Sequence, residues 1–298
     1  KKKSLKALAE CNLPLAKKSK PYSINTFHNL HLMNKLHSSL QINISGISFK
    51  KASASINPPI LFEAKSLKKS YRNKIVIHDI SLQVGVGEVI GLLGPNGAGK
   101  TTAFYLITGL INPDRGQFFF KGQEISHLPI HQRAKMGMGY LSQEPSVFRQ
   151  LTVEENLLCI LETLPIKAPE RANRLKHLLE ELHLTPLAKK KALTLSGGER
   201  RRLEITRALI TEPCFLLLDE PFANIDPIAV HDVKLMIRHL QNKGISILIT
   251  DHNAREIFSI VNRSYLIQEG RVLLSGTVDD LLKNKEARTN YFGEHFKL

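Results

Sequence analysis

The sequence has little of what marks a secreted, disulfide-rich or membrane-spanning protein. It contains three cysteines and no tryptophan in 298 residues. Cys11, Cys159 and Cys214 are far apart without CxxC spacing, which favours reduced thiols over a disulfide framework or a zinc site. The longest apolar runs, such as 215–218 and 245–249, are far shorter than the ~18 residues that a membrane-spanning helix needs. These absences favour a soluble chain in a reducing compartment.

Acidic residues are almost missing from the first part of the chain. Residues 1–59 hold ten lysines, no arginine and one acid, Glu10, so they carry +9 of the total net charge of +15. The other residues carry +6 and show neither a basic stripe nor interleaved basic and aromatic positions. We therefore expect no nucleic-acid partner. The length fits one large α/β domain or two small ones.

The basic segment 1–58 lacks sustained helical or strand periodicity and ends in a Pro-Pro pair. This composition predicts a largely disordered N-terminal extension. Its scarcity of acids resembles an organelle transit peptide, although such peptides favour arginine. Because the chain begins with Lys rather than Met, sequence upstream of the natural start and a natural tail are the alternatives. An ordered domain is expected over residues 59–298.

From Ile60 on, short apolar runs alternate with helical patterns. The first two strands are expected to be joined by a basic turn that contains Tyr71. Leucines at helical spacing, which follow a capping box at Thr152, predict an inserted helical segment. Such alternation is typical of an α/β fold with a parallel core sheet. The predicted strands are 60–64, 75–84, 88–93, 116–120, 215–218 and 245–250, and the other predicted helices are 101–110 and 227–244.

A glycine-rich loop joins the strand at 88–93 to the following helix. Residues 94–101 fit the phosphate-binding pattern G-x-x-x-x-G-K-[ST] in the strand–loop–helix context that supports it. Glycines let backbone N–H groups surround phosphate oxygens, and the helix N-terminus favours an anion. We expect Lys100 to contact the β- and γ-phosphates of a nucleotide and the Thr101 hydroxyl to bind Mg²⁺. The predicted nucleotide-binding residues are Gly94, Pro95, Asn96, Gly97, Ala98, Gly99, Lys100, Thr101 and Thr102.

Two carboxylates follow the apolar run at 215–218. A parallel strand delivers such residues at its C-terminal edge, where α/β sheets bind ligands. We expect Asp219 to bind Mg²⁺ and Glu220 to act as the general base toward an attacking water. For this pair, the alternative is a solvated strand end. For the whole chain, the alternatives are an ATP-gated scaffold and a nucleic-acid-binding module driven by the basic N-terminal segment, neither of which would need a positioned base.

The segment 195–199, Leu-Ser-Gly-Gly-Glu, lies between these motifs. The order of phosphate loop, helical insert, LSGGE and FLLLDE resembles the ATP-binding cassette (ABC) ATPases over residues 60 to about 280. The resemblance implies an α/β P-loop NTPase (RecA-like) core with an antiparallel β subdomain. It also implies an α-helical subdomain at about 146–208 and a C-terminal tail at about 281–298. Glutamine is commoner in the family where this chain has Glu199.

The resemblance also implies roles for single residues. The LSGGE motif would close over ATP bound to the other subunit of a head-to-tail homodimer; a glycine helix cap without a ligand is the alternative. Tyr71 would stack on adenine, unless it is an ordinary surface residue. Asp226 would contact the opposite subunit, unless it only caps a helix. His252 would contact the γ-phosphate and orient Glu220. The signature residues are Ser196, Gly197, Gly198 and Glu199, the predicted catalytic residues are Lys100, Gln143, Glu220 and His252, and the predicted Mg²⁺ ligands are Thr101, Gln143 and Asp219.

Longer stretches resemble one branch of the family, the ATPases of lipopolysaccharide exporters. This resemblance implies a cytoplasmic ATPase, peripheral on the inner membrane, that powers lipopolysaccharide extraction and its transport to the outer membrane. It implies two transmembrane permease subunits docked near Pro145, Val147, Phe148 and Arg149, for which local subdomain packing is the alternative. Branched-chain amino-acid importers share much of the core and are the alternative branch. The stretches are 91–105, 139–149, 195–205, 218–227, 249–256 and 291–298.

Overall fold

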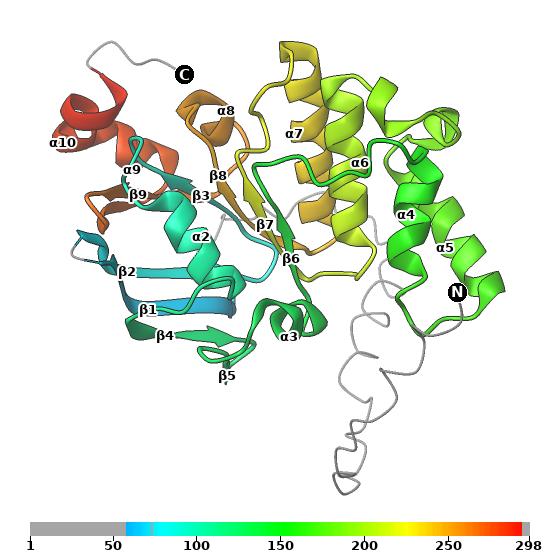
Figure 1. Cartoon of the computed structure of the whole chain (residues 1–298). Coiled ribbons are helices and arrows are strands. Elements are labelled where there is room, and N and C mark those ends of the chain that lie inside the picture. The colour runs from blue at the N-terminus through cyan, green and yellow to red at the C-terminus, as the bar shows by residue number, and fades with distance from the viewer. Residues whose placement is uncertain (1–57, 73, 294–298) are drawn as a thin grey trace, which may run out of the picture. The chain divides into compact units, whose positions relative to one another are not determined.

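The computed structural model describes residues 58–72 and 74–293 (Figure 1). The predicted disordered extension, apart from Pro58, and Cys11 lie outside these residues, as does the end of the chain from Glu294. Within the described ranges, no helix has the length and apolar character needed to cross a membrane.

The strands of the described part form one mixed sheet in the order β5-β4-β1-β2-β10-β9-β3-β8-β7-β6. Strands β9, β3, β8, β7 and β6 pair in parallel, whereas β1, β2, β4 and β5 pair antiparallel. Strand β10 joins the two parts, since it pairs with β9 and, through Arg271 and Asp79, with β2. The strands are β1 Ile60–Tyr71, β2 Lys74–Gly85, β3 Val89–Leu93, β4 Arg115–Phe120, β5 Gln123–Glu124, β6 Met138–Leu141, β7 Phe215–Asp219, β8 Ser246–Thr250, β9 Arg263–Gln268 and β10 Arg271–Gly276.

Helices α4, α5 and α6 follow β6 and precede β7 in the chain. They have an apolar cluster of their own, which includes Val153, Leu157 and Leu203. In Figure 1, α4 and α5 lie beyond α6, on the side away from β1 and β2. The α-helices are α2 Lys100–Thr108, α3 Ile130–Lys135, α4 Val153–Leu161, α5 Ala168–Glu181, α6 Gly197–Leu209, α7 Pro227–Asn242, α8 Ala254–Phe258, α9 Val278–Lys283 and α10 Lys285–Ala287.

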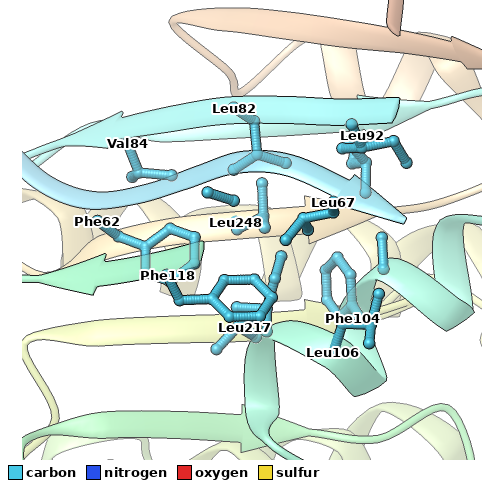
Figure 2. Packing of buried hydrophobic residues seen from close by; sticks show 14 of the residues in the cluster. Phe62, Leu67, Leu82, Val84, Leu92, Phe104, Leu106, Phe118, Leu217 and Leu248 are labelled. Carbon is cyan, nitrogen blue, oxygen red and sulfur yellow. The ribbon is translucent and has the colours of Figure 1, made fainter. Parts of the chain in front are cut away.

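The parallel strands are buried on both faces. Phe215 and Leu217 of β7 join the cluster that contains β1, β4 and α2, whereas Leu216 and Leu218 join the cluster that contains α7. Because successive side chains of a strand point to opposite faces, such a strand reads as a continuous apolar run. Figure 2 shows the packing of the first cluster around Phe62, Phe118 and Leu217. The ring of Phe62 stacks on that of Phe215 with 5.1 Å between their centroids. These runs were therefore visible in the sequence.

The first hairpin differs from the prediction, which ended the first strand at Ala64 and placed Tyr71 in a turn. Strand β1 instead continues to Tyr71, which pairs with Lys74 of β2. Strand β1 lies between β2 and β4, and Leu67 is fully buried among polar neighbours. An antiparallel strand can leave one face in water, so its second half carries no apolar run. The prediction of a turn at Tyr71 was wrong for this reason.

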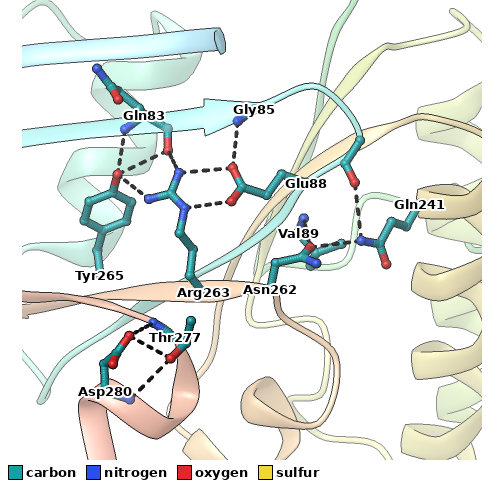
Figure 3. A network of polar contacts seen from close by, with 11 residues as sticks. Gln83, Gly85, Glu88, Val89, Gln241, Asn262, Arg263, Tyr265, Thr277 and Asp280 are labelled. Carbon is teal, nitrogen blue, oxygen red and sulfur yellow. Dashed lines mark hydrogen bonds and ion pairs between the residues drawn. The ribbon is translucent and has the colours of Figure 1, made fainter. Parts of the chain in front are cut away.

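A polar network ties the strands together at the edge of the sheet where β3 and β9 begin (Figure 3). The guanidinium of Arg263 binds both carboxylate oxygens of Glu88, with N–O distances of 2.7 and 3.0 Å. It also donates to the carbonyl oxygen of Gln83 and to the hydroxyl of Tyr265, each at 2.8 Å. This network fixes the start of β3, at the end opposite to the glycine-rich loop.

Candidate active site

The glycine-rich loop connects the fully buried β3 to α2. Gly94 has a φ of 156°, and a Cβ there would lie 2.3 Å from the carbonyl oxygen of Ile267 in β9. Gly99 caps α2 in the left-handed region, with a φ of 103°. A side chain at Gly94 would clash with backbone, and one at Gly99 would be strained. Pro95, Asn96 and Gly97 are exposed at the outside of the loop, and Ala98 is buried.

Lys100 lies folded back under this loop. Its Nζ donates to the carbonyl oxygens of Gly94 at 2.7 Å and of Pro95 at 3.0 Å, and the residue is 8% exposed. Burial lowers the pKa of Lys100, against the opposing effect of the carboxylates of Glu220, Asp219 and Asp251. The first turn of α2 holds no acidic residue, and its N-cap has no side chain. The loop is therefore a cationic cradle with helix N–H groups available to an anion.

Asp219 ends β7 and is almost completely buried. Its Oδ1 accepts a hydrogen bond from the Thr250 hydroxyl at 2.6 Å. Its Oδ2 is buried and has no hydrogen-bond partner among the described residues. Burial is the main cause that raises the pKa of Asp219. A buried carboxylate oxygen without a donor is suited to binding a hard cation such as Mg²⁺.

Glu220 follows directly and has an unusual backbone, with a φ of 47°. Its N–H donates to the carbonyl oxygen of Thr250 at 2.9 Å. Its Oε2 accepts from Nε2 of Gln143 at 2.8 Å and lies 3.8 Å from Nδ1 of His252. Such left-handed conformations of larger residues are costly and cluster at functional sites. The ends of β6, β7 and β8 thus bring Gln143, Glu220 and His252 together.

Two buried residues of this site were not singled out from the sequence. Arg201 of α6 donates to the carbonyl oxygens of Asp219, Glu220 and Pro221 at 3.2, 2.9 and 3.1 Å. Its Nη1 also pairs with Glu204 at 2.9 Å. Helical spacing was a usable signal, because a residue four positions before the apolar Ile205 falls on the buried face.

The LSGGE motif begins α6. Ser196 is the N-cap, and its Oγ accepts from the N–H of Glu199 at 3.2 Å. The carboxylate of Glu199 accepts from the N–H of Ser196 at 2.8 Å, which completes a capping box. A Cβ on Gly198 would lie 2.5 Å from the Cβ of Ala229 in α7, and one on Gly197 would lie 3.3 Å from the Asn224 carbonyl oxygen. Gly198 therefore also allows close packing of α6 against α7, and Gly197 allows close approach of the segment before α7.

Tyr71 and Asp226 lie on other elements. Asp226 is the N-cap of α7, and its Oδ1 accepts from the N–H of Ala229 at 2.9 Å. Tyr71 ends β1 and is 45% exposed. The hairpin that it belongs to runs beside the glycine-rich loop, because a Cβ on Gly99 would lie 3.2 Å from the carbonyl oxygen of Val76 in β2. Thr101 and Thr102 are half-buried in the first turn of α2.

The loop after Gln143 presents an aromatic ring at the surface. Phe148 is 51% exposed, and the guanidinium of Arg207 lies 5.0 Å from its ring centroid. The buried side chain of Asn156 accepts from the N–H of Phe148 at 2.8 Å and donates to its carbonyl oxygen at 3.0 Å. Val147 packs into the helical cluster, whereas Pro145 and Arg149 are exposed. The loop thus presents an exposed aromatic ring next to arginine side chains.

Taken together, the strand ends offer a cradle for phosphate groups, an unpartnered carboxylate oxygen for a cation and a carboxylate beside an amide and an imidazole. A carboxylate in that position can accept a proton from water. This arrangement suits hydrolysis of a phosphoanhydride better than simple nucleotide binding.

Comparison with known proteins agrees with this geometry. Residues 77–223 match the ABC transporter family. The lipopolysaccharide export system ATP-binding protein LptB of Acidithiobacillus ferridurans is 52% identical over 80% of this chain and 99% of that protein. The protein of the same name from Escherichia coli K12 is 46% identical over 79% of this chain and 98% of its own length. The dimeric structure of the ATP-binding cassette MJ0796 with ADP and Pi shares the fold, with a TM-score of 0.65, 23% identity and coverage of 73% of this chain and 99% of that chain.

These matches confirm the predicted α/β P-loop fold of the ABC type. They also explain why the phosphate loop, the LSGGE segment and the Asp-Glu pair occur in one chain and in this order. The chain belongs to the ABC transporter family, as one of its ATP-binding ATPase subunits.

Proposed function

We propose that this ATPase powers lipopolysaccharide export, as a homodimer bound to two permease subunits at the cytoplasmic face of the inner membrane. It drives extraction of lipopolysaccharide from that membrane and transport to the outer membrane. The observation that carries this assignment is 52% identity to an export protein over 99% of the length of that protein. Import of branched-chain amino acids is not favoured, because both relatives named above are export proteins.

The nucleotide is ATP, held by residues 94–102. Lys100 exchanges the carbonyl oxygens that it now contacts for β- and γ-phosphate oxygens. Tyr71, which is exposed beside the loop, stacks on adenine. Mg²⁺ is held by Thr101, Gln143 and Asp219 and neutralises phosphate charge when bound. Support for the metal comes from the buried, unpartnered Oδ2 of Asp219.

Glu220 is the general base. It accepts a proton from water as the water oxygen attacks the γ-phosphorus and the bond to the ADP oxygen breaks. Gln143 donates to its carboxylate and fixes its direction. His252 is close to the same carboxylate and 62% exposed, which leaves it free to contact the γ-phosphate. Positioning and electrostatic stabilisation supply most of the rate in such a site.

The ABC domain spans 59–298, with a helical subdomain at about 146–208 and a tail at about 281–298. Within the dimer, Ser196, Gly197, Gly198 and Glu199 of one subunit close over ATP bound to the other, and Asp226 contacts the opposite subunit. A cassette of the same fold, MJ0796, has a dimeric structure with ADP and Pi. ATP then joins the two subunits until it is hydrolysed.

The permease subunits dock on the loop of Pro145, Val147, Phe148 and Arg149. An exposed aromatic ring backed by Arg207 is the kind of anchor that protein interfaces use. Dimer closure moves this loop and transmits force to the permeases.

Three experiments test the proposal. Glu220→Gln should trap ATP in a stable dimer and hydrolyse it far more slowly, while unchanged hydrolysis would remove Glu220 as the base. Co-expression with the two export permeases should give a complex that releases lipopolysaccharide when ATP is added. Exclusive pairing with importer permeases would overturn the export assignment. Phe148→Ala should weaken permease binding without changing the ATPase activity of the isolated subunit.

A further inference from the structure

We infer that the carboxylate of Glu199 weakens the ATP-closed dimer and thereby speeds its reopening, in addition to capping α6. This inference rests on the proposed homodimer, in which the start of α6 meets the γ-phosphate bound to the other subunit. It assigns a function to the residue at which this chain departs from the commoner glutamine of its family.

The capping box fixes where the charge lies. The carboxylate of Glu199 accepts from the N–H of Ser196 at 2.8 Å, so it is held at the first turn of α6. The Oγ of Ser196 accepts from the N–H of Glu199 at 3.2 Å, and its own O–H remains able to donate. The hydroxyl proposed to meet phosphate and the carboxylate that repels phosphate are therefore joined in one hydrogen-bonded pair.

The charge of Glu199 competes with the ligand. A helix N-terminus favours one nearby anion, and here the helix supplies its own in the first turn. A γ-phosphate that approaches Ser196 meets a like charge at short range. Arg201, in the next turn, pairs with Glu204 at 2.9 Å, and Arg200 donates to the Leu195 carbonyl oxygen at 3.3 Å. No ion pair of Glu199 occurs among the described residues.

Glutamine would keep the cap and remove the charge. Its side-chain oxygen can accept the same N–H, since glutamate and glutamine both complete capping boxes. The effect of charge can therefore be separated from the effect of helix stability. This separation is what makes a single isosteric substitution informative.

The test compares Glu220→Gln with the double variant Glu199→Gln/Glu220→Gln, both as the full chain with MgATP. The rate at which the ATP-bound dimer dissociates is measured after dilution, by loss of energy transfer between labelled subunits. We expect the double variant to dissociate about 3- to 10-fold more slowly at low salt, because a like charge near the phosphate is gone. This difference should shrink as salt rises from 0.05 to about 0.5 M, because the repulsion is screened.

A matched control exists in α4, where Thr152 and Glu155 form a second capping box with the corresponding distances of 2.7 and 3.3 Å. Glu155→Gln in the Glu220→Gln background should leave the dissociation rate unchanged. The inference would be overturned if Glu220→Gln and Glu199→Gln/Glu220→Gln dissociated at the same rate at low salt. It would also be overturned if their difference did not depend on salt, or if Glu155→Gln slowed dissociation as much as Glu199→Gln. If Glu220→Gln forms no ATP-dependent dimer at all, the proposed function fails first, and the inference falls with it.

Discussion

Arg201 donates from Nη2 to the backbone carbonyl oxygen of Glu220 at 2.9 Å. The same guanidinium binds the carbonyl oxygens of Asp219 and Pro221, which flank it. These three carbonyls belong to the segment in which Glu220 adopts a φ of 47°. A side chain of the helix that begins with LSGGE therefore holds the backbone that aims the proposed base. A displacement of α6 would therefore reach the backbone of Glu220 through Arg201.

Arg201→Met should reduce both stability and turnover. It leaves the nearly fully buried carboxylate of Glu204 without its cation, which costs about 3–5 kcal/mol of the free energy of unfolding. We expect kcat to fall about 100-fold, because a small misplacement of a catalytic group can slow a reaction by that factor. Urea denaturation and steady-state ATPase assays measure the two effects.

The double variant Arg201→Met/Glu204→Met separates them. Removing both charges should recover much of the lost stability. Because the three carbonyls still lack their donor, kcat should stay as low as in Arg201→Met. Recovery of kcat together with stability would show that Arg201 does not position Glu220.

Asp219→Asn should stabilise the nucleotide-free protein at neutral pH while abolishing Mg²⁺-dependent hydrolysis. Burial raises the pKa of Asp219, so the folded state binds this proton more tightly than the unfolded state. The free energy of unfolding therefore falls as pH rises from the unfolded pKa through the raised folded pKa, by about 1.4 kcal/mol for each pH unit between the two. Asparagine is uncharged, so it does not carry the cost of burying an ionised carboxylate.

Thermal unfolding between pH 4 and pH 8 in EDTA checks the sign of this effect. The Tm of Asp219→Asn should exceed that of the parent near pH 8, and the gap should close toward pH 4. MgATP should raise the Tm of the parent more than that of the variant. A variant that is less stable than the parent at pH 8 would contradict the role of burial at this carboxylate.

The sequence predicts the motif-bearing strands of this fold but not the contacts that orient the motifs. The strand before Asp219 is buried on both faces and therefore appears as an apolar run, whereas the second half of β1 has one face in water and was predicted as a turn. Arg201 and Arg133 donate mainly to backbone carbonyls. Because every residue has a backbone carbonyl, the residue types do not reveal such a partner. The spacing of Ser196 and Glu199 is enough to suggest a capping box. Only the structure shows that the box forms and therefore where the carboxylate of Glu199 lies.

Arg133→Met should destabilise the protein from beneath α2. Arg133 of α3 is 1% exposed and donates to four carbonyl oxygens, including those of Leu106 and Ile107 at the end of α2 at 2.9 and 2.6 Å. Its loss leaves buried acceptors without donors, which should cost about 2–4 kcal/mol of the free energy of unfolding. Arg238→Met is the control, because Arg238 makes one carbonyl contact at the surface. Equal urea midpoints for the two variants would refute the expectation.

Asp114→Asn should weaken ATP binding without slowing hydrolysis of bound ATP. The Asp114 carboxylate accepts from the N–H of Ser70 at 2.6 Å, from its hydroxyl at 2.5 Å and from Nζ of Lys69 at 3.0 Å, next to Tyr71. The Ser70 hydroxyl, Lys69 and the Ser70 N–H together lower the pKa of Asp114 to about 2. Loss of these charge-assisted bonds should loosen the end of β1 that carries Tyr71, the proposed adenine contact. We expect KM for ATP to rise about 3- to 10-fold, the equivalent of one hydrogen bond, with kcat unchanged.

The pH dependence and a control make this expectation specific. A lowered carboxyl pKa means that the contact is complete above the unfolded value of 3.8 and is lost only as pH falls through about 2. The difference in KM should therefore stay constant between pH 6 and pH 9. Asp79→Asn, an exposed aspartate on β2, should leave KM unchanged. Tyr71→Ala should raise KM at least as much as Asp114→Asn, and adding Asp114→Asn to it should have little further effect, because the residue that Asp114 positions is already gone.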